Sequence, residues 1–201
     1  MITIVDVQIG NIGSVTRALK YLKSKYIVTD KTEDIISASK LIFPGVGSFS
    51  EASKKLENSG LRETLQKQVL VMKKPILGIC LGMQLFAKEG FEGGRNEGLG
   101  FLDASVVQMK AKDLGLRLPH MGWNELSSYQ LKLLNGVKEQ SCFYFVHSYE
   151  MKLNEDVPHV TTDYGSNVVA MIEKGNIFAT QFHPEKSQEA GLKILRNFIE
   201  L

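Results

Sequence analysis

The chain has 201 residues, with 24 Lys and Arg against 22 Asp and Glu, so its formal net charge is +2. At roughly 100–200 residues per domain, this length predicts a single domain over residues 1–201 with a sizeable core. Charged residues make up 23% of the chain, which excludes a disordered or collagen-like protein. The near balance of charges excludes a strongly basic nucleic-acid binder, so we expect no nucleic-acid partner.

Cysteine content and apolar runs indicate the compartment. Only two cysteines are present, Cys80 and Cys142, which excludes a disulfide framework and favours a reduced, intracellular protein. The N-terminus has no basic segment before its apolar residues, so it does not resemble a signal peptide. No apolar run approaches the ~20 residues that a membrane helix requires. We therefore expect a soluble, cytoplasmic protein without a membrane partner.

The first half of the chain alternates strand and helix patterns. Short apolar runs predict strands, and apolar residues spaced i, i+3, i+4, i+7 predict helices. The expected strands are 2–7, 26–29, 41–43 and 75–79. The expected helices are 14–25, one opening at Ser48 with a capping box to Glu51, one along the stripe Leu61, Leu65, Val69 and Met72, and 82–88. Such alternation is typical of a parallel sheet with helices on both faces.

The second half of the chain is richer in strands. They are expected at 105–109, 142–147, 159–162, 168–172 and 177–182, with Cys142 in a core strand. A final helix is expected over 188–201, with Ser187 as its N-cap and Leu192, Leu195 and Ile199 buried. The whole pattern predicts a three-layer α/β fold, with a central, mostly parallel sheet flanked by helices and extended by antiparallel strands.

A candidate nucleophile lies between the strand at 75–79 and the helix at 82–88. The segment Gly78-Ile79-Cys80-Leu81-Gly82 has the nucleophile-elbow pattern, with Cys in place of Ser. The glycines allow a tight strand-to-helix turn, in which Cys80 is strained and points outward. Its sulfur then lies at a helix N-terminus, which favours the thiolate. A small buried cysteine between two packing glycines would also satisfy so short a motif.

A candidate general acid and base follows the last predicted strand. In an extended segment, residues i and i+2 lie on one side, so His183 and Glu185 can hydrogen-bond, and Pro184 keeps His183 extended. A carboxylate on one imidazole nitrogen leaves the other for the sulfur. A surface turn would explain His-Pro-Glu alone, but a Cys elbow and a His-x-Glu at strand ends together indicate an active site.

The remaining candidate features are a glycine loop and the other histidines. Pro44-Gly45-Val46-Gly47 follows a strand, where backbone N–H groups could approach a substrate oxyanion, although a simple turn would also fit. No Gly-Lys-Ser/Thr follows it, so it is not a phosphate loop. None of the four histidines has metal-ligand spacing, and we expect no metal.

Three motifs now carry a family resemblance. P-G-V-G at 44–47, G-I-C-L-G-M-Q at 78–84 and Q-F-H-P-E-K-S at 181–187 resemble the triad-type, class I glutamine amidotransferases across essentially the whole chain. The segments P-H-M-G-W-N at 119–124 and Y-F-V-H-S-Y at 144–149 are similar to the members that serve as glutaminase subunits in histidine biosynthesis. Relatives acting in anthranilate, GMP or carbamoyl phosphate synthesis share the triad but not the His-Met-Gly-Trp-Asn segment.

The resemblance implies a mechanism for L-glutamine hydrolysis without a cofactor. Cys80 would attack the side-chain amide to form a glutamyl thioester, His183 would protonate the ammonia and then activate water, and Glu185 would orient His183. The backbone of Val46 and Gly47, with the N–H of Leu81, would form the oxyanion hole. The residues that would hold glutamine are Gln84, Glu92, Ser148 and Tyr149.

The resemblance also implies a partner. Ammonia would pass through a tunnel into a (β/α)8 cyclase subunit, in a heterodimer that makes imidazole glycerol phosphate and an aminoimidazole carboxamide ribotide. Residues expected at or near that interface are Asn11, Trp123, Tyr144 and Lys186. The N-terminal loop departs from the family at Val7, where an aromatic residue is common, and at Gly13, where a larger one is common.

Three other functions stay open at this point. A paralogous glutaminase subunit could supply ammonia for the amidination of a surface-glycan sugar. A stand-alone cysteine hydrolase or peptidase is a different class, but it leaves Gln84 and the His-Met-Gly-Trp-Asn segment unexplained. A catalytically silent binding subunit would normally lack one of Cys80, His183 and Glu185, and all three are present.

Overall fold

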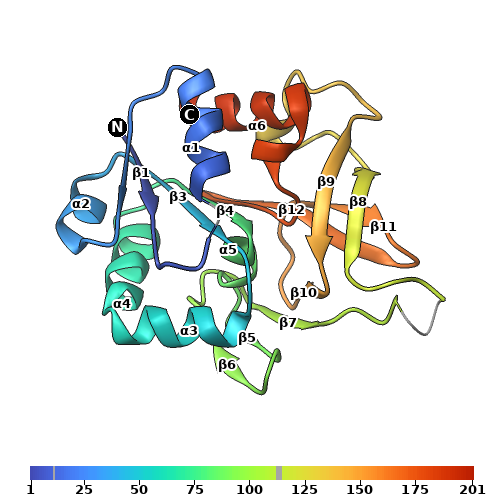
Figure 1. Cartoon of the computed structure of the whole chain (residues 1–201), viewed down its shortest axis with the longest axis horizontal. Coiled ribbons are helices and arrows are strands. Elements are labelled where there is room, and N and C mark those ends of the chain that lie inside the picture. The colour runs from blue at the N-terminus through green and yellow to red at the C-terminus, as the bar shows by residue number, and fades with distance from the viewer. Residues whose placement is uncertain (11, 112–114) are drawn as a thin grey trace.

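The computed structural model of the chain describes residues 1–10, 12–111 and 115–201. A seven-stranded sheet forms its centre, in the order β11-β12-β13-β4-β3-β1-β2 (Figure 1). From β2 to β13 neighbouring strands are parallel, and β12 and β11 continue the sheet antiparallel. The strands are β1 (Ile2–Val5), β2 (Tyr26–Thr29), β3 (Lys40–Gly45), β4 (Ile76–Cys80), β11 (His159–Asp163), β12 (Asn167–Lys174) and β13 (Ile177–Thr180).

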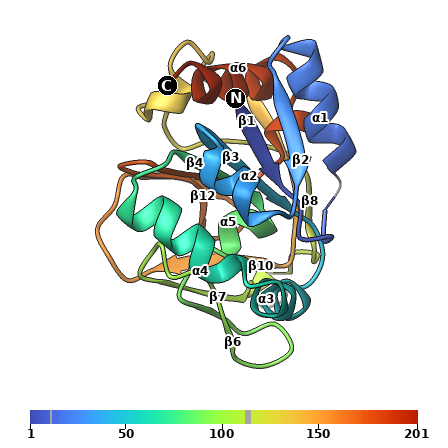
Figure 2. The same ribbon diagram turned by 90° about the vertical axis from the view of Figure 1, so that its left-hand side faces the viewer.

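Helices cover both faces of this sheet, as the alternating pattern predicts. One face carries α1 (Ile12–Tyr21) and α6 (Gln188–Glu200), and the other carries α2 (Thr32–Ser37), α3 (Phe49–Asn58) and α4 (Leu61–Gln66) (Figures 1 and 2). Strand β3 shows why such strands read as continuous apolar runs. Ile42 packs with the residues of α1 and α6, whereas Leu41 and Phe43 pack with those of α2, α3 and α4. The three-layer α/β fold is therefore confirmed.

Two smaller sheets come mainly from the second half of the chain. One has the order β10-β7-β5-β6, and the other pairs β8 with β9 antiparallel. Their strands are β5 (Glu89–Gly90), β6 (Asn96–Glu97), β7 (Ala104–Gln108), β8 (His120–Glu125), β9 (Cys142–His147) and β10 (Tyr149–Leu153), with 3-10 turns at Lys132–Leu134 and Pro184–Lys186. Sequence reasoning missed β5, β6, β8 and β10, and also α2. No helix among the described residues is long and apolar enough to cross a membrane.

The helix expected over 82–88 is wrong in length. Helix α5 covers only Leu81–Gln84. The backbone carbonyls that would continue it accept hydrogen bonds from the segment 99–102 instead: Leu85 from Leu99, Ala87 from Gly100 and Phe86 from Leu102. These contacts join residues more than ten positions apart, so a local pattern cannot reveal them.

The residues predicted to be buried along two of the helices are also partly wrong. Met72 is exposed rather than buried, because α4 continues as a π-helical segment at Lys67–Val71, whose wider turn shifts the side chains out of phase. In α6, Ile194, Leu195 and Phe198 face the core, and Leu192 and Ile199 are only half-buried.

Two further local expectations are wrong. Ser48 is the N-cap residue of α3, but its side chain makes no capping hydrogen bond and lies 2.8 Å from the Ser50 hydroxyl. Cys142 is exposed at the first position of β9 instead of lying in the core. The other predicted strands agree with the structure to within about two residues at each end, whereas α1 begins at Ile12 and ends at Tyr21 rather than covering 14–25.

Candidate active site

Cys80 forms the strand-to-helix turn that its sequence pattern predicts. It ends β4 and caps α5, with φ 55° and ψ −110°, a backbone conformation that L-residues adopt only under strain. A Cβ atom at Gly82 would collide with the backbone carbonyl of Phe43, and one at Gly78 would lie 2.7 Å from the Phe86 ring. Both glycines are therefore required by close packing, at Gly78 mainly against a side chain.

His183 and Glu185 form a buried pair just beyond β13. Nδ1 of His183 lies 2.8 Å from Oε1 of Glu185, and the two side chains are 3% and 2% exposed. His183 is extended as expected, but Pro184–Lys186 is a 3-10 turn rather than a continued strand, so the turn brings Glu185 back to the ring. The backbone N–H of His183 donates to the Tyr144 carbonyl, and the Ser187 hydroxyl donates to the His183 carbonyl.

The electrostatics of this pair favour the imidazolium. Burial by itself lowers the pKa of His183, but hydrogen bonding and negative charge at the Cys80 sulfur and the Glu185 carboxylate outweigh it and raise the pKa to about 9. Nε2 of His183 and Oε2 of Glu185 are buried and have no hydrogen-bond partner among the residues that the structure describes. Nε2 is thus left for a reacting group, and at neutral pH it carries a proton.

The sheet brings these groups together. Strand β13 runs parallel to β4, with Thr180 beside Ile79, so the residues that follow both strands meet at one edge of the sheet. A pocket of about 270 Å³ opens there. It is lined by Val46, Gly47, Cys80, Leu81, Gln84, Glu92, Pro119, Val146, His147, Ser148 and Tyr149. All the residues predicted for the oxyanion hole and for glutamine lie around this pocket.

Two of those residues, Gln84 and Glu92, also make hydrogen bonds to other segments of the protein. The Gln84 amide nitrogen donates to the Tyr149 carbonyl at 3.0 Å and to Oε1 of Gln181 at 2.9 Å. Oε2 of Glu92 accepts the N–H of Phe49 at 2.7 Å, which caps α3 in place of the expected box. Each side chain therefore makes hydrogen bonds within the protein and also lines the pocket.

The predicted oxyanion donors are not all turned toward the pocket. The N–H of Val46 donates to the Ile9 carbonyl at 2.7 Å. The N–H of Leu81 belongs to the first turn of α5, where such groups have no partner within the helix. A role for the Val46 N–H would thus require its bond to the loop at 6–10 to break.

The residues predicted at a partner interface form one cluster, apart from Asn11, which lies outside the described residues. Trp123 is 48% exposed and its ring lies 5.9 Å, edge-on, from Tyr144. The Lys186 ammonium lies 5.5 Å from the Tyr144 ring centroid. Because Tyr144 also holds the His183 backbone, this aromatic and cationic cluster adjoins the buried pair.

Sequence reasoning missed three buried polar residues beside the pocket. Nδ1 of His120 lies 3.1 Å from Nε2 of His147, and burial lowers the pKa of each to about 4. Gln181 is fully buried next to Cys80. Gln181 opens the Q-F-H-P-E-K-S motif and precedes His183 by two positions, and these are the sequence signals that could have placed it beside the site. Within the described residues, no group of three His, Cys, Asp or Glu could hold a metal.

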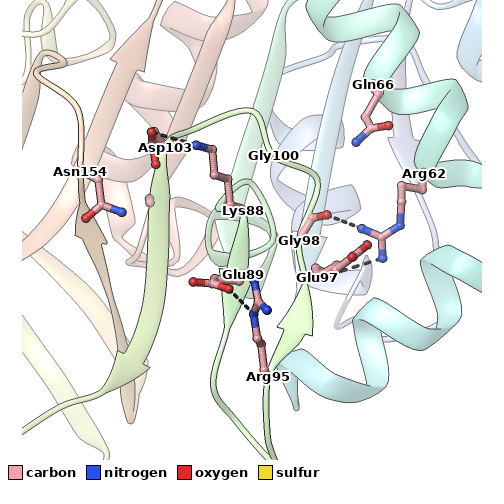
Figure 3. Close-up of a pocket in the computed structure, with 11 residues that line it drawn as sticks. Arg62, Gln66, Lys88, Glu89, Arg95, Glu97, Gly98, Gly100, Asp103 and Asn154 are labelled. Atoms are coloured by element: carbon pink, nitrogen blue, oxygen red, sulfur yellow. Dashed lines mark hydrogen bonds and ion pairs between the residues drawn. The ribbon is translucent and has the colours of Figure 1, made fainter.

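A separate hollow of about 370 Å³ lies beside α4 and the β5–β6 hairpin (Figure 3). Its cations contact oxygen atoms inside it: Lys88 pairs with Asp103 at 2.8 Å, Arg95 pairs with Glu89 at 2.6 Å, and Arg62 donates to the Gly98 carbonyl. Each of these three cations therefore already contacts an oxygen of the protein, whereas Nε2 of His183 and Oε2 of Glu185 have no such partner among the described residues.

The chain is similar over its whole length to known glutamine amidotransferases. The family model "Glutamine amidotransferase class-I" matches residues 3–201. Imidazole glycerol phosphate synthase subunit HisH 1 of Campylobacter jejuni strain RM1221 is 50% identical over 202 residues, which cover 100% of both chains. The subunit HisH of Pelagibacter ubique is 43% identical over 206 residues, covering 100% of this chain and 99% of its own.

A solved structure shares the fold. The crystal structure of a glutamine amidotransferase from Thermotoga maritima superposes with a TM-score of 0.71 at 18% identity, covering 99% of this chain and 96% of that chain. The family model and the full-length relatives together show that this protein belongs to the class-I glutamine amidotransferase family.

Proposed function

We propose that this chain is the glutaminase subunit of an imidazole glycerol phosphate synthase, acting as a single amidotransferase domain over residues 1–201. The observation that carries the proposal is the meeting of a strained Cys80 with the buried His183–Glu185 pair at neighbouring strand ends. The full-length relatives that are named as subunits of that synthase support the histidine pathway. We assign the reaction to the cytoplasm, where Cys80 stays reduced.

The reaction is an acyl transfer in two steps. The Cys80 thiolate attacks the amide carbon of glutamine, and the carbon–nitrogen bond breaks as the His183 imidazolium gives its proton to the departing ammonia. The neutral His183 then takes a proton from water, whose oxygen attacks the thioester. Glutamate leaves, and Cys80 and His183 regain their starting charges. Glu185 keeps the His183 ring oriented throughout, and the cycle needs no cofactor.

The pocket suits an amino acid with a side-chain amide. The Glu92 carboxylate, whose Oε2 is engaged by α3, offers its other oxygen to the ammonium of glutamine. The nitrogen of Gln84 is engaged within the protein, so only its oxygen is left for the substrate. Ser148 and Tyr149 also line the pocket.

We propose that a partner controls the oxyanion hole, formed by the N–H groups of Val46, Gly47 and Leu81. Because the N–H of Val46 is bonded to Ile9, the isolated chain has one donor fewer for the tetrahedral intermediate, which costs about 10²- to 10³-fold in kcat in enzymes with a comparable site. A partner that binds the rearranged loop more tightly would shift the population toward it. The isolated chain should therefore hydrolyse glutamine slowly.

The proposed partner is a (β/α)8 cyclase subunit that receives the ammonia. The exposed Trp123 and the half-buried Tyr144 and Lys186 beside it support this, because aromatic residues and cations are typical of interface centres. Asn11 would join them at that interface. The heterodimer would convert the ammonia and a ribotide into imidazole glycerol phosphate and an aminoimidazole carboxamide ribotide.

The first experiment measures glutamate release from glutamine by the purified chain. It is run alone, with a histidine-pathway cyclase subunit, and with that subunit plus its ribotide ligand. We expect slow turnover alone and strong stimulation by the pair, and no turnover by Cys80→Ala in either setting.

Each other outcome has a distinct meaning. Turnover retained by Cys80→Ala would reject the nucleophile. Equal rates with and without the cyclase would reject the partner and point to another acceptor, such as the sugar-amidination pathway. Peptide cleavage without a partner would indicate a stand-alone hydrolase.

A further inference from the structure

A continuous line of hydrogen bonds leads from a half-buried backbone carbonyl to the buried Cys80 sulfur. The Tyr149 carbonyl accepts the Gln84 amide nitrogen at 3.0 Å, and the same nitrogen donates to Oε1 of Gln181 at 2.9 Å. Nε2 of Gln181 lies 3.8 Å from Sγ of Cys80. Gln181 is the one member of this line for which neither the motifs nor the proposed reaction supplies a role.

The direction of every bond in this line follows from the Tyr149 carbonyl. A carbonyl oxygen can only accept, so the Gln84 side chain must present its NH2 group there. The second hydrogen of that NH2 then requires an acceptor, which fixes Oε1 of Gln181 toward Gln84. The NH2 group of Gln181 is left to face Cys80, and it can only donate. The sulfur therefore faces a hydrogen-bond donor whose orientation is set by the backbone.

The sheet explains why Gln181 stands at this place. Thr180 pairs with Ile79 across the parallel strands β13 and β4, so the next position along each strand brings Gln181 beside Cys80. The N–H of Gln181 donates to the Ala170 carbonyl, which anchors its backbone. Gln181 is 0% exposed and is not among the residues that line the pocket. It thus contacts the sulfur from inside the protein.

We infer that Gln181 is a positioning residue of the amidotransferase reaction, which holds the Cys80 sulfur and stabilises its negative charge through the Nε2 hydrogen bond. The inference rests on the proposed function, in which Cys80 is the nucleophile. A hydrogen bond to a charged atom is stronger than one to a neutral atom, and most of all in a buried site. Gln181 should therefore stabilise the charged sulfur that attacks the amide more than it would stabilise a neutral sulfur.

Two substitutions separate the donor from the rest of the side chain. Gln181→Glu is nearly isosteric and keeps an oxygen for Gln84, but replaces the NH2 group that faces Cys80. Gln181→Met keeps the length and an unbranched shape and removes both polar groups. The matched control is Gln66→Met in α4, because the Gln66 amide also donates to a backbone carbonyl, that of Leu99 at 3.0 Å, outside the pocket.

The first measurement is thiol reactivity, which needs no substrate. The chain is treated with iodoacetamide at pH 7, and alkylation of Cys80 is compared with that of the exposed Cys142 in the same molecule by mass spectrometry. We expect both Gln181 variants to lower the Cys80-to-Cys142 ratio at least about fivefold, because a charged hydrogen bond is lost. The Gln66→Met variant should keep the ratio of the unmodified chain.

The second measurement is the glutaminase rate in the presence of the cyclase partner. Loss of a charged hydrogen bond predicts a kcat about 10- to 100-fold lower for both variants, with KM changed less than about threefold. Thermal unfolding shows which variants are folded, and Gln181→Glu retains the bond to Gln84 if Gln181→Met does not fold. A folded variant with an unchanged alkylation ratio and unchanged kcat overturns the inference, and so does a rise in KM alone.

This failure is distinct from a failure of the proposed function. If Cys80→Ala still hydrolyses glutamine, the nucleophile is wrong and the Gln181 inference falls with it. If Cys80→Ala is inactive but the Gln181 variants react and turn over like the unmodified chain, only the inference is overturned.

Discussion

Replacing Glu185 by Gln removes the charge that holds His183 and leaves the shape of the side chain. The pKa of His183 is raised from 6.5 to about 9, which at about 1.4 kcal/mol per pH unit is equivalent to roughly 3 kcal/mol in favour of the imidazolium. Two neighbours, Cys80 and Glu185, raise it against burial. Glu185→Gln should therefore lower the pKa of His183, because burial remains and the carboxylate charge is lost.

The loss of kcat should exceed what the change in His183 protonation alone would cause, because the imidazole ring also loses its orientation. We expect kcat for glutamine to fall by about 10²- to 10⁴-fold, in the range seen when a triad carboxylate becomes an amide. The assay is steady-state glutamate release with the cyclase partner present. The exposed Glu189, in the first turn of α6, supplies the control Glu189→Gln, which should keep its rate.

The same variant has a stability signature. Since the folded pKa of His183 lies above 6.5, its interactions stabilise the fold fully below about pH 6.5, and this contribution is lost as the pH rises through about 9. Denaturant unfolding should show that decline in the unmodified chain and a smaller one in Glu185→Gln. A variant with normal kcat and an unchanged decline would refute the assignment of Glu185.

Three further predictions concern stability at low pH, the tight turn at Cys80 and the surface around Trp123. Because burial lowers the pKa of His120 and His147 to about 4, unfolding free energy should fall as the pH drops from 6.5 to 4, and less steeply in His120→Phe. Gly82→Ala should lower the unfolding free energy by about 3 kcal/mol, since the added Cβ would meet the Phe43 carbonyl. The control is Gly10→Ala, where the nearest atom to the added Cβ would be 3.6 Å away. Trp123→Ala should weaken cyclase binding at least tenfold by calorimetry, at about the hot-spot scale, and unaltered affinity would reject that face.

The parts of the site that were predictable lie close together in sequence. The Cys80 turn is a property of seven or so consecutive residues, because strand, glycines and helix follow one another and sterics permit few conformations there. His183 and Glu185 are two positions apart, so their hydrogen bond needs only a local turn. The parallel sheet followed from the alternation of strands and helices, and it implied that the residues after β4 and β13 meet.

Other features depended on segments that are far apart along the chain. Helix α5 stops at Gln84 because the segment 99–102 takes the carbonyls of the following residues. Glu92 caps α3 from 43 positions away, where a local capping box was expected. The N–H of Val46 is bonded to Ile9, a choice that no pattern within the glycine loop determines.

The chain by itself determined which chemistry is present: a cysteine, a histidine and a carboxylate at the ends of strands that must pair. Only the tertiary structure decided how the sulfur is held, because Gln84 and Gln181 are 97 positions apart and meet only when β13 lies against β4. Local sterics and hydrophobic periodicity act between near neighbours in sequence. The direction of a buried hydrogen bond depends on which carbonyl stands at its end, and packing alone brings that carbonyl into place.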